Sequence, residues 1–110
     1  MGQRIQIVPM IGFRLFGSLV KKEIDLGRKN QGTFFRSGRK AKDKTRWSHK
    51  SYAGWLNIER TAGEIVAIEV NTRGKEAADW QLLHAFVGSV ARHFADQVEA
   101  MHIHFSEPTK

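Results

Sequence analysis

Residues 52–71 read YAGWLNIERTAGEIVAIEVN, and this stretch decides the fold that we expect. Apolar and polar side chains alternate through residues 52–60 and again through residues 64–71, which predicts two half-buried strands. The three residues between them, Thr61-Ala62-Gly63, are typical of a short hairpin connection in which the glycine takes a positive φ. The two strands are therefore predicted to pair as an antiparallel hairpin.

Toward the C-terminus, the apolar period changes from two residues to three or four. This change over residues 75–95 predicts a helix, and its apolar stripe contains Trp80, Leu83, Val87, Val90 and Phe94. We expect the stripe, Trp80 included, to pack in the core. Gly88 in mid-helix is expected to let the sheet or another helix approach closely. A last strand follows at residues 98–105, and residues 106–110 are expected to fray.

Toward the N-terminus, the pattern is weaker. Residues 3–8 and 33–36 are predicted to be short strands, whereas the apolar residues 10–26 are compatible with either a strand pair or a helix. Together, the elements predict one α+β domain over residues 1–110. We expect an antiparallel sheet of about four to five strands, a ββαβ second half, and one long helix on one face of the sheet.

Composition excludes several classes of protein. The 110 residues contain no cysteine, which excludes disulfides, cysteine nucleophiles and cysteine-ligated zinc. No apolar run approaches the ~18–20 residues that span a bilayer. The first residues, Met1-Gly2-Gln3-Arg4, lack the pattern of a signal peptide. We therefore expect a cytoplasmic protein that does not associate with membranes.

The positive charge of the chain is concentrated in one segment. The formal net charge is +7, yet residues 28–50 contain nine lysines and arginines against Asp43 alone, and residues 51–110 carry an acidic excess. Residues 37–50 have no apolar period before Trp47, which predicts a flexible basic loop. Such a local surplus favours a polyanionic partner, although a solvated loop without a partner would have the same composition.

From this segment we predict a non-enzymatic module that binds RNA or single-stranded DNA. Cationic side chains would pair with phosphates, while Trp47 and Tyr52 would stack on unpaired bases. The residues expected to bind nucleic acid are Arg36, Arg39, Lys40, Lys42, Lys44, Arg46, Trp47, His49, Lys50 and Tyr52. The sequence has no RNP1, GXXG, zinc-knuckle or helix-turn-helix motif that would name the type of module.

Two alternatives stay open. A small metal-free ribonuclease would use His49 as general acid or base, with Arg46 and Lys50 on the phosphate and Tyr52 as a stacking group. A homodimeric interaction domain without a nucleic-acid role would instead use Trp55, His102 and His104 on the uncovered face of the sheet.

His102 and His104 would lie on one side of a strand, about 7 Å apart. A metal site would need a third ligand, such as Glu59, Glu69 or His49, and none has a diagnostic spacing. We therefore expect no metal and no other cofactor. The usual nucleotide-binding and hydrolase motifs do not occur in the sequence either.

Overall fold

The computed structural model describes residues 3–39, 41–72 and 76–105. Its main elements, in chain order, are β1 (Arg4–Pro9), α1 (Leu15–Arg28), β2 (Phe34–Arg36), β3 (Lys44–His49), β4 (Trp55–Arg60), β5 (Val66–Asn71), α2 (Glu76–Phe94) and β6 (Val98–His104). Two short 3-10 turns, Ala62–Glu64 and Ala95–Gln97, precede β5 and β6. The expected fraying of residues 106–110 lies outside the described residues.

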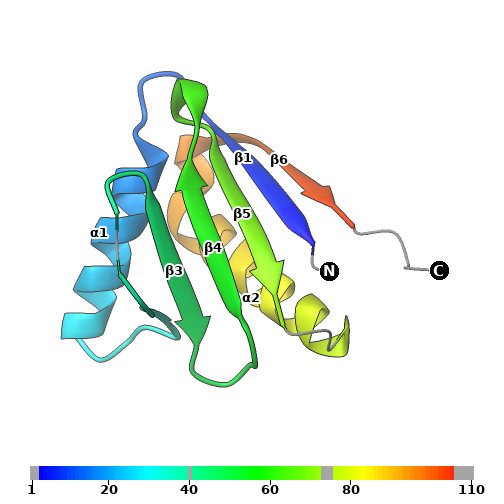
Figure 1. The fold of residues 1–110 in the computed structure, drawn as a ribbon. Helices are drawn as coiled ribbons and strands as arrows, with labels where there is room; N and C mark the ends of the chain where they lie inside the picture. The colour runs from blue at the N-terminus through cyan, green and yellow to red at the C-terminus, as the bar shows by residue number, and fades with distance from the viewer. Residues whose placement is uncertain (1–2, 40, 73–75, 106–110) are drawn as a thin grey trace.

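The described strands form one antiparallel sheet of six strands in the order β2-β3-β4-β5-β1-β6 (Figure 1). The predicted α+β class, the long helix of the second half and the last strand are confirmed. The sheet has more strands than we expected. The additional strand is β3, since residues 44–49 were assigned to the loop over residues 37–50, and this expectation was wrong for them.

β3 is not visible in the sequence pattern because only one of its two inward side chains is apolar. Thr45 and Trp47 are buried, whereas Lys44 and Arg46 point to the other side. One of the two buried side chains is a hydroxyl, so the alternation gives almost no apolar signal. Its hydrogen-bonded neighbours on both sides, β2 and β4, hold the strand in place.

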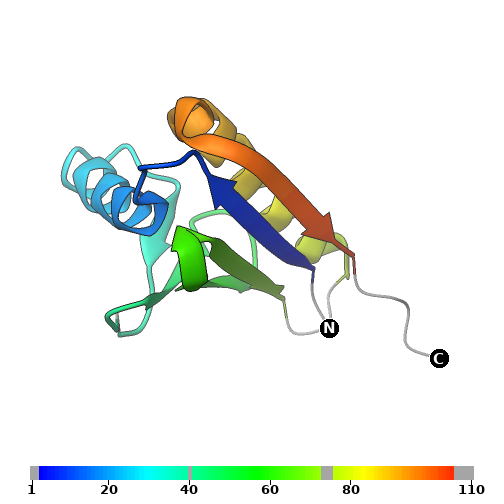
Figure 2. The same ribbon diagram turned by 90° about the horizontal axis from the view of Figure 1, so that it is seen from above.

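Residues 15–28 form a second helix, which answers the question that the sequence left open. Leu15, Phe16 and Leu19 are buried on one side of α1, whereas Gly17 is exposed and interrupts no contact. Figure 1 shows α1 and α2 behind the sheet, and Figure 2 shows them on the same side of it. The expectation of a single covering helix is therefore corrected to two helices in one layer.

The core lies between this helix layer and the inward side chains of the strands. Its fully buried members include Ile5 and Ile7 of β1, Ile58 of β4, and Leu82 and Phe86 of α2. Trp80 is the exception to the predicted apolar stripe, since 55% of it is exposed. The buried side of α2 centres on the turn around Leu82, Leu83 and Phe86, so Trp80 falls outside it and its ring contacts Phe105 instead.

The hairpin between β4 and β5 forms as predicted, with a longer connection. Gly63 has a φ of 69°, the positive value that the sequence indicated. Glu64 also has a positive φ, of 64°, because the chain makes a 3-10 turn before β5 starts at Val66. The three-residue loop that we expected is thus corrected to a five-residue connection, residues 61–65.

The described part of the chain contains two α-helices, α1 and α2. Neither has both the length and the apolar character that a membrane-crossing helix needs. This finding concerns helices within the described part of the chain.

Candidate nucleic-acid interface

The face of the sheet that the helices leave uncovered, here called the open face, has a polar row across five strands. Strand register places Arg46 of β3, Asn57 of β4, Glu69 of β5, Arg4 of β1 and His104 of β6 next to one another. Cross-strand neighbours point to the same side of a sheet, so their side chains share this face. The row brings together residues from both ends of the chain.

Polar contacts connect most of this row. Arg46 Nε donates a hydrogen bond to Asn57 Oδ1 at 3.2 Å, and Asn57 Nδ2 donates to Glu69 Oε1 at 3.4 Å. The Arg4 guanidinium lies 3.8 Å from Glu69 Oε2. These contacts orient the Arg46 side chain, so its guanidinium is held against the sheet instead of extending freely into solvent.

Two aromatic side chains flank Arg46 on the same face. The Arg46 guanidinium carbon lies 5.1 Å from the ring centroid of Trp55, which is cation–π distance. Trp55 pairs with Ser48, and Ser48 pairs with Phe35 on β2. Ser48 is small, and Phe35 is 41% exposed. The two rings therefore stand two strands apart, roughly 10 Å, with little between them.

The open face is hollowed next to Arg46, and Phe35 and Trp55 stand outside the lining of this hollow. A depression of about 1010 Å³, here called the open-face hollow, is lined by charged and amide side chains. Its charged or amide lining residues are Arg4, Gln6, Arg39, Lys44, Arg46, Asn57, Glu59 and Glu69, with His104 at one side. Cations outnumber carboxylates in this lining, and Lys44 Nζ lies 3.5 Å from Glu59 Oε2. The hollow is thus moderately electropositive, with the carboxylates already paired to cations.

Three of the predicted nucleic-acid-binding cations, Arg39, Lys44 and Arg46, line this hollow. Arg36 is exposed, but its register partner is Trp47, which places it on the side of the sheet that the helices cover. Lys42 and Lys50 are exposed at the two ends of β3. Lys40 lies outside the described residues.

Trp47 does not have the role that we predicted from the sequence. It is only 5% exposed and packs in the core. Its ring centroid lies 5.9 Å from that of Phe34 and 6.2 Å from that of Phe86. A ring enclosed in this way has no face to offer a base, so the expectation that Trp47 stacks on nucleic acid is corrected.

His49 and Tyr52 form a compact turn after β3. His49 Nδ1 accepts hydrogen bonds from the backbone N–H groups of Ser51, at 2.9 Å, and Tyr52, at 3.3 Å. The imidazole stacks on the Tyr52 ring with centroids 4.5 Å apart, and its other neighbour is the ring of Phe34. Partial burial lowers the pKa of His49. These contacts give the imidazole a structural role in its neutral form.

The residues of the ribonuclease alternative are brought together only in part, since His49 stacks on Tyr52 but Arg46 lies on the other face. His49 pairs with Phe34 on the helix-covered side of β3, whereas Arg46 faces the open side. Neighbouring positions of a strand point to opposite faces, so side chains three residues apart diverge. A phosphate held by Arg46 is therefore not positioned for proton transfer to His49.

The residues of the homodimer alternative share a face but not a patch. Trp55 lies on β4, and His102 and His104 lie on β6, with β5 and β1 between them.

Within the described residues, no group of three histidine, cysteine, aspartate or glutamate side chains could hold a metal ion.

The sequence reasoning missed Arg4, Gln6, Phe35 and Asn57. Arg4, Gln6 and Asn57 carried part of a signal, since each lies in a predicted strand and alternates with apolar neighbours, whereas Phe35 stands next to another phenylalanine and does not. The position of Arg4 and Gln6 beside this site could not be predicted, because nothing in the local pattern indicates that β1 lies beside β5.

Comparisons with other proteins add nothing to this geometry. No protein-family model matches the sequence, and no curated protein and no solved structure is significantly similar to it.

Proposed function

We propose that the protein is a non-enzymatic module that binds RNA or single-stranded DNA on the open face of its sheet. The observation that carries the proposal is the position of Arg46, which is held over Trp55 beside an electropositive hollow. Arg4, Arg39 and Lys44 surround the same hollow, and Phe35 is exposed on the other side of Ser48. Cations next to accessible rings on a sheet are what a flexible single strand requires.

Each group has a physical task in this proposal. The guanidinium groups of Arg39 and Arg46 would pair with phosphates, because their planar forks match phosphate oxygens. Phe35 and the exposed part of Trp55 would stack on bases. This stacking does not depend on the base sequence, because every base has a flat ring face. Asn57 and Gln6 carry amides that donate to and accept from base edges. Glu59 and Glu69 hold Lys44 and Arg4 in place and moderate the affinity.

The test is a fluorescence-anisotropy titration of a labelled 12-nucleotide RNA of mixed sequence at several salt concentrations. We expect binding that weakens with salt, with a logarithmic slope of about −3 if four cations meet phosphates. Arg46→Gln should weaken binding about five- to twentyfold at low salt and make the slope shallower by about 0.7. Negligible binding even at low salt would overturn the proposal.

A matched control comes from the same basic segment. Lys29 is exposed at the C-terminal end of α1, which lies on the helix side of the sheet. Lys29→Gln removes the same charge as Arg46→Gln without touching the open face, so it should leave the affinity nearly unchanged. Equal losses for both variants would mean that total charge, not the open face, attracts the RNA.

The same titration also distinguishes binding from cleavage. We expect the RNA to be recovered intact after prolonged incubation. Cleavage that persists in a chelator and disappears in His49→Ala would replace this proposal with the ribonuclease alternative.

A further inference from the structure

The last strand, β6, forms one edge of the sheet (Figure 1). It pairs with β1 on one side, and within the described residues no strand pairs with its other side. β6 has seven residues, and its register with β1 is regular from Ala100 to His104. Alternate backbone N–H and C=O groups of an antiparallel edge strand point away from the sheet, so this edge can pair with another strand.

The opposite edge of the sheet is protected from such pairing. β2 has only three residues and ends at Arg36, and the segment that follows contains Arg39 and Lys42. Short edge strands and charged side chains are devices by which proteins prevent edge-to-edge pairing. β6 has neither protection, because it is longer and Glu99 is its only lysine, arginine, aspartate or glutamate.

Exposed apolar side chains gather beside the free edge of β6. Ile103 pairs with the buried Ile5 of β1, so it faces the helix layer, yet it is 37% exposed. Phe105, the residue after β6, is 59% exposed, and its ring centroid lies 6.3 Å from that of Trp80, which is 55% exposed. These three side chains form an apolar strip between α2 and the edge of the sheet.

One side of α2 continues this strip. Trp80, His84, Val87 and Ala91 recur at three- and four-residue steps, so they share one side of the helix. The Trp80 ring contacts both His84 and Phe105, so this side of α2 faces the end of β6. The strip therefore extends along the helix as well as along the strand.

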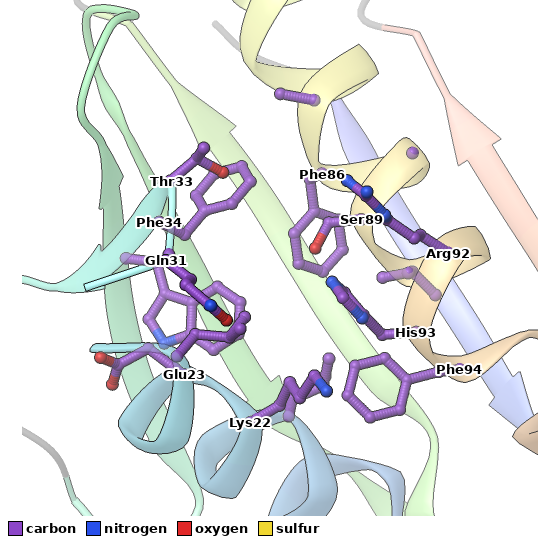
Figure 3. A pocket seen from close by; sticks show the side chains of 17 residues that line it. Lys22, Glu23, Gln31, Thr33, Phe34, Phe86, Ser89, Arg92, His93 and Phe94 are labelled. Atoms are coloured by element: carbon purple, nitrogen blue, oxygen red, sulfur yellow. The ribbon is translucent and has the colours of Figure 1, made fainter. Parts of the chain in front are cut away.

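The lysines and arginines of the chain lie away from this surface. Residues 80–91 and 93–105 contain none, although the net charge of the chain is +7. The side of α2 that faces α1 is different, since Figure 3 shows Lys22 and His93 pointing into the space between the helices, near Arg92. Two copies of a basic protein repel each other least where such charges are absent. The β6 edge is therefore the surface that suits a second copy of the chain.

Gly88 takes no part in this surface, because it lines the space between α2 and α1. We expected that Gly88 would let the sheet or another helix approach closely. A Cβ atom there would meet nothing within 4 Å, so this expectation was wrong.

We propose that two copies of the chain pair along β6 and form one continuous antiparallel sheet. A two-fold axis runs perpendicular to this sheet, so both helix layers lie on the same side. The exposed apolar strips of the two copies then cover each other. The dimer does not rest on nucleic-acid binding, since its contacts lie at the edge of the sheet and beside α2.

The side chains of β6 indicate the register of this pairing. Cross-strand neighbours point to the same side of a sheet, so one residue of β6 lies opposite its own copy at the axis. We place Ile103 there, because Met101 then faces the partner's Phe105 on the helix side. On the open side, His102 faces the partner's His104. This register joins all the apolar side chains of the two strips.

Sedimentation equilibrium at protein concentrations from about 2 to 500 µM tests the proposal. The contact is smaller than a standard interface, so we expect a monomer–dimer equilibrium with a Kd of roughly 10–100 µM and no larger species. Ile103→Lys should weaken the dimer at least about tenfold, because two ammonium groups would face each other across the axis. A protein that stays monomeric over the whole range, or that forms species larger than a dimer, would overturn the proposal.

Two further variants accompany Ile103→Lys. Trp80→Ser should weaken the dimer about threefold or more, and it tests the strip without altering β6. The matched control is Phe35→Lys, because Phe35 is 41% exposed on the other edge strand. It should leave the equilibrium unchanged, and circular dichroism shows whether each variant is folded. A dimer that Phe35→Lys abolishes and Trp80→Ser leaves intact would lie at the β2 edge, which contradicts the proposal.

The absence of cysteine from the chain allows the register to be tested by cross-linking. Ile103→Cys places two thiols opposite each other, whereas Glu99→Cys places them about 27 Å apart along the strands. Glu99 is exposed on the same strand, so it is a fair control. Under mild oxidation we expect disulfide-linked dimers to form at least about tenfold faster with Ile103→Cys than with Glu99→Cys. Equal rates would mean that random collisions link the copies, and the proposal would be wrong.

Discussion

His49 stabilises the turn after β3 through its neutral imidazole. Nδ1 accepts the Ser51 and Tyr52 N–H groups, and a proton on that nitrogen would remove the acceptor. Burial keeps the pKa of His49 below the ordinary histidine value of 6.5. The stabilisation is therefore present above pH 6.5 and is lost as the pH falls through the lowered pKa of the folded state.

We accordingly expect the wild-type protein to melt at a lower temperature at pH 5 than at pH 7.5, partly because of His49. The difference in melting temperature between the wild type and His49→Ala should be larger at pH 7.5 than at pH 5. Thermal unfolding followed by circular dichroism at both pH values measures this change. A difference that is the same at both values would mean that protonation of His49 is not linked to folding.

Gly54 is required where β4 begins beside the end of β5. Its φ is +97°, and a Cβ atom there would lie 2.7 Å from Thr72 Cγ2 and against the Asn71 carbonyl oxygen. Both the backbone conformation and the collision oppose any side chain. We expect Gly54→Ala to lower the free energy of unfolding by about 3 kcal/mol, measured by urea denaturation.

A variant at Gly12 distinguishes the cost of the backbone conformation from the cost of the collision. The φ of Gly12 is +90°, but a Cβ atom there would meet nothing within 4 Å. Gly12→Ala carries only the cost of the backbone conformation, about 1–2 kcal/mol. If Gly54→Ala and Gly12→Ala lowered the free energy of unfolding equally, the chain would have relaxed around residue 54 and the collision would add no cost.

At the scale of an element, β3 divides its residues between two tasks. Trp47 faces the helices and packs on Phe34 and Phe86, whereas Arg46 faces the open side. We expect Trp47→Ala to lower the free energy of unfolding by about 3–5 kcal/mol, as for other buried aromatic residues. Arg46→Gln should lower it by only about 1 kcal/mol, since it removes an exposed cation–π contact with Trp55 and no core packing.

Urea denaturation of the two variants measures this contrast. If Trp47→Ala were as stable as the wild type and lost RNA affinity instead, Trp47 would be a binding residue, as the sequence alone suggested.

The elements that the sequence predicted well are those whose period is long or strict. The helix at Glu76–Phe94 and the hairpin strands of β4 and β5 each repeat their apolar pattern several times. β3 has only Thr45 and Trp47 to bury, so charge dominates its composition and it resembles a loop. α1 is obscured by Gly12 and Gly17, although its buried Leu15, Phe16 and Leu19 follow helical spacing.

The candidate site was predictable only in part, for a related reason. The basic segment at residues 28–50 indicated which charges matter but not that they separate in space. Arg28 and Lys29 end α1, whereas Arg39, Lys44 and Arg46 line the open-face hollow. The partners Arg4 and Asn57 depend on strand register, which is a long-range property that local patterns do not contain.

At the scale of the whole molecule, the N-terminal strand holds the sheet together. β1 lies between β5 and β6, with Ile5 paired to Ile68 on one side and to Ile103 on the other. The first strand of the chain thus pairs with the last one, and β6 has its sheet hydrogen bonds to β1. Loss of β1 would detach β6 and uncover α2, so we expect the sheet and both helices to unfold as one unit.

Ile7→Ala tests this cooperativity, because Ile7 is fully buried in β1. It should lower the free energy of unfolding by about 2–5 kcal/mol, while tryptophan fluorescence and far-ultraviolet circular dichroism still report one coincident urea transition. Ile24→Ala on the exposed side of α1 is the matched control and should cost less than about 1 kcal/mol. The measurement uses a Trp80→Phe background, because the Trp80 ring contacts Phe105 next to β6. The remaining tryptophans, Trp47 and Trp55, report on β3 and β4, far from β6 in the order of the sheet. Two separated transitions would therefore mean that β1 and β6 unfold apart from the rest, and that the chain is not one cooperative domain.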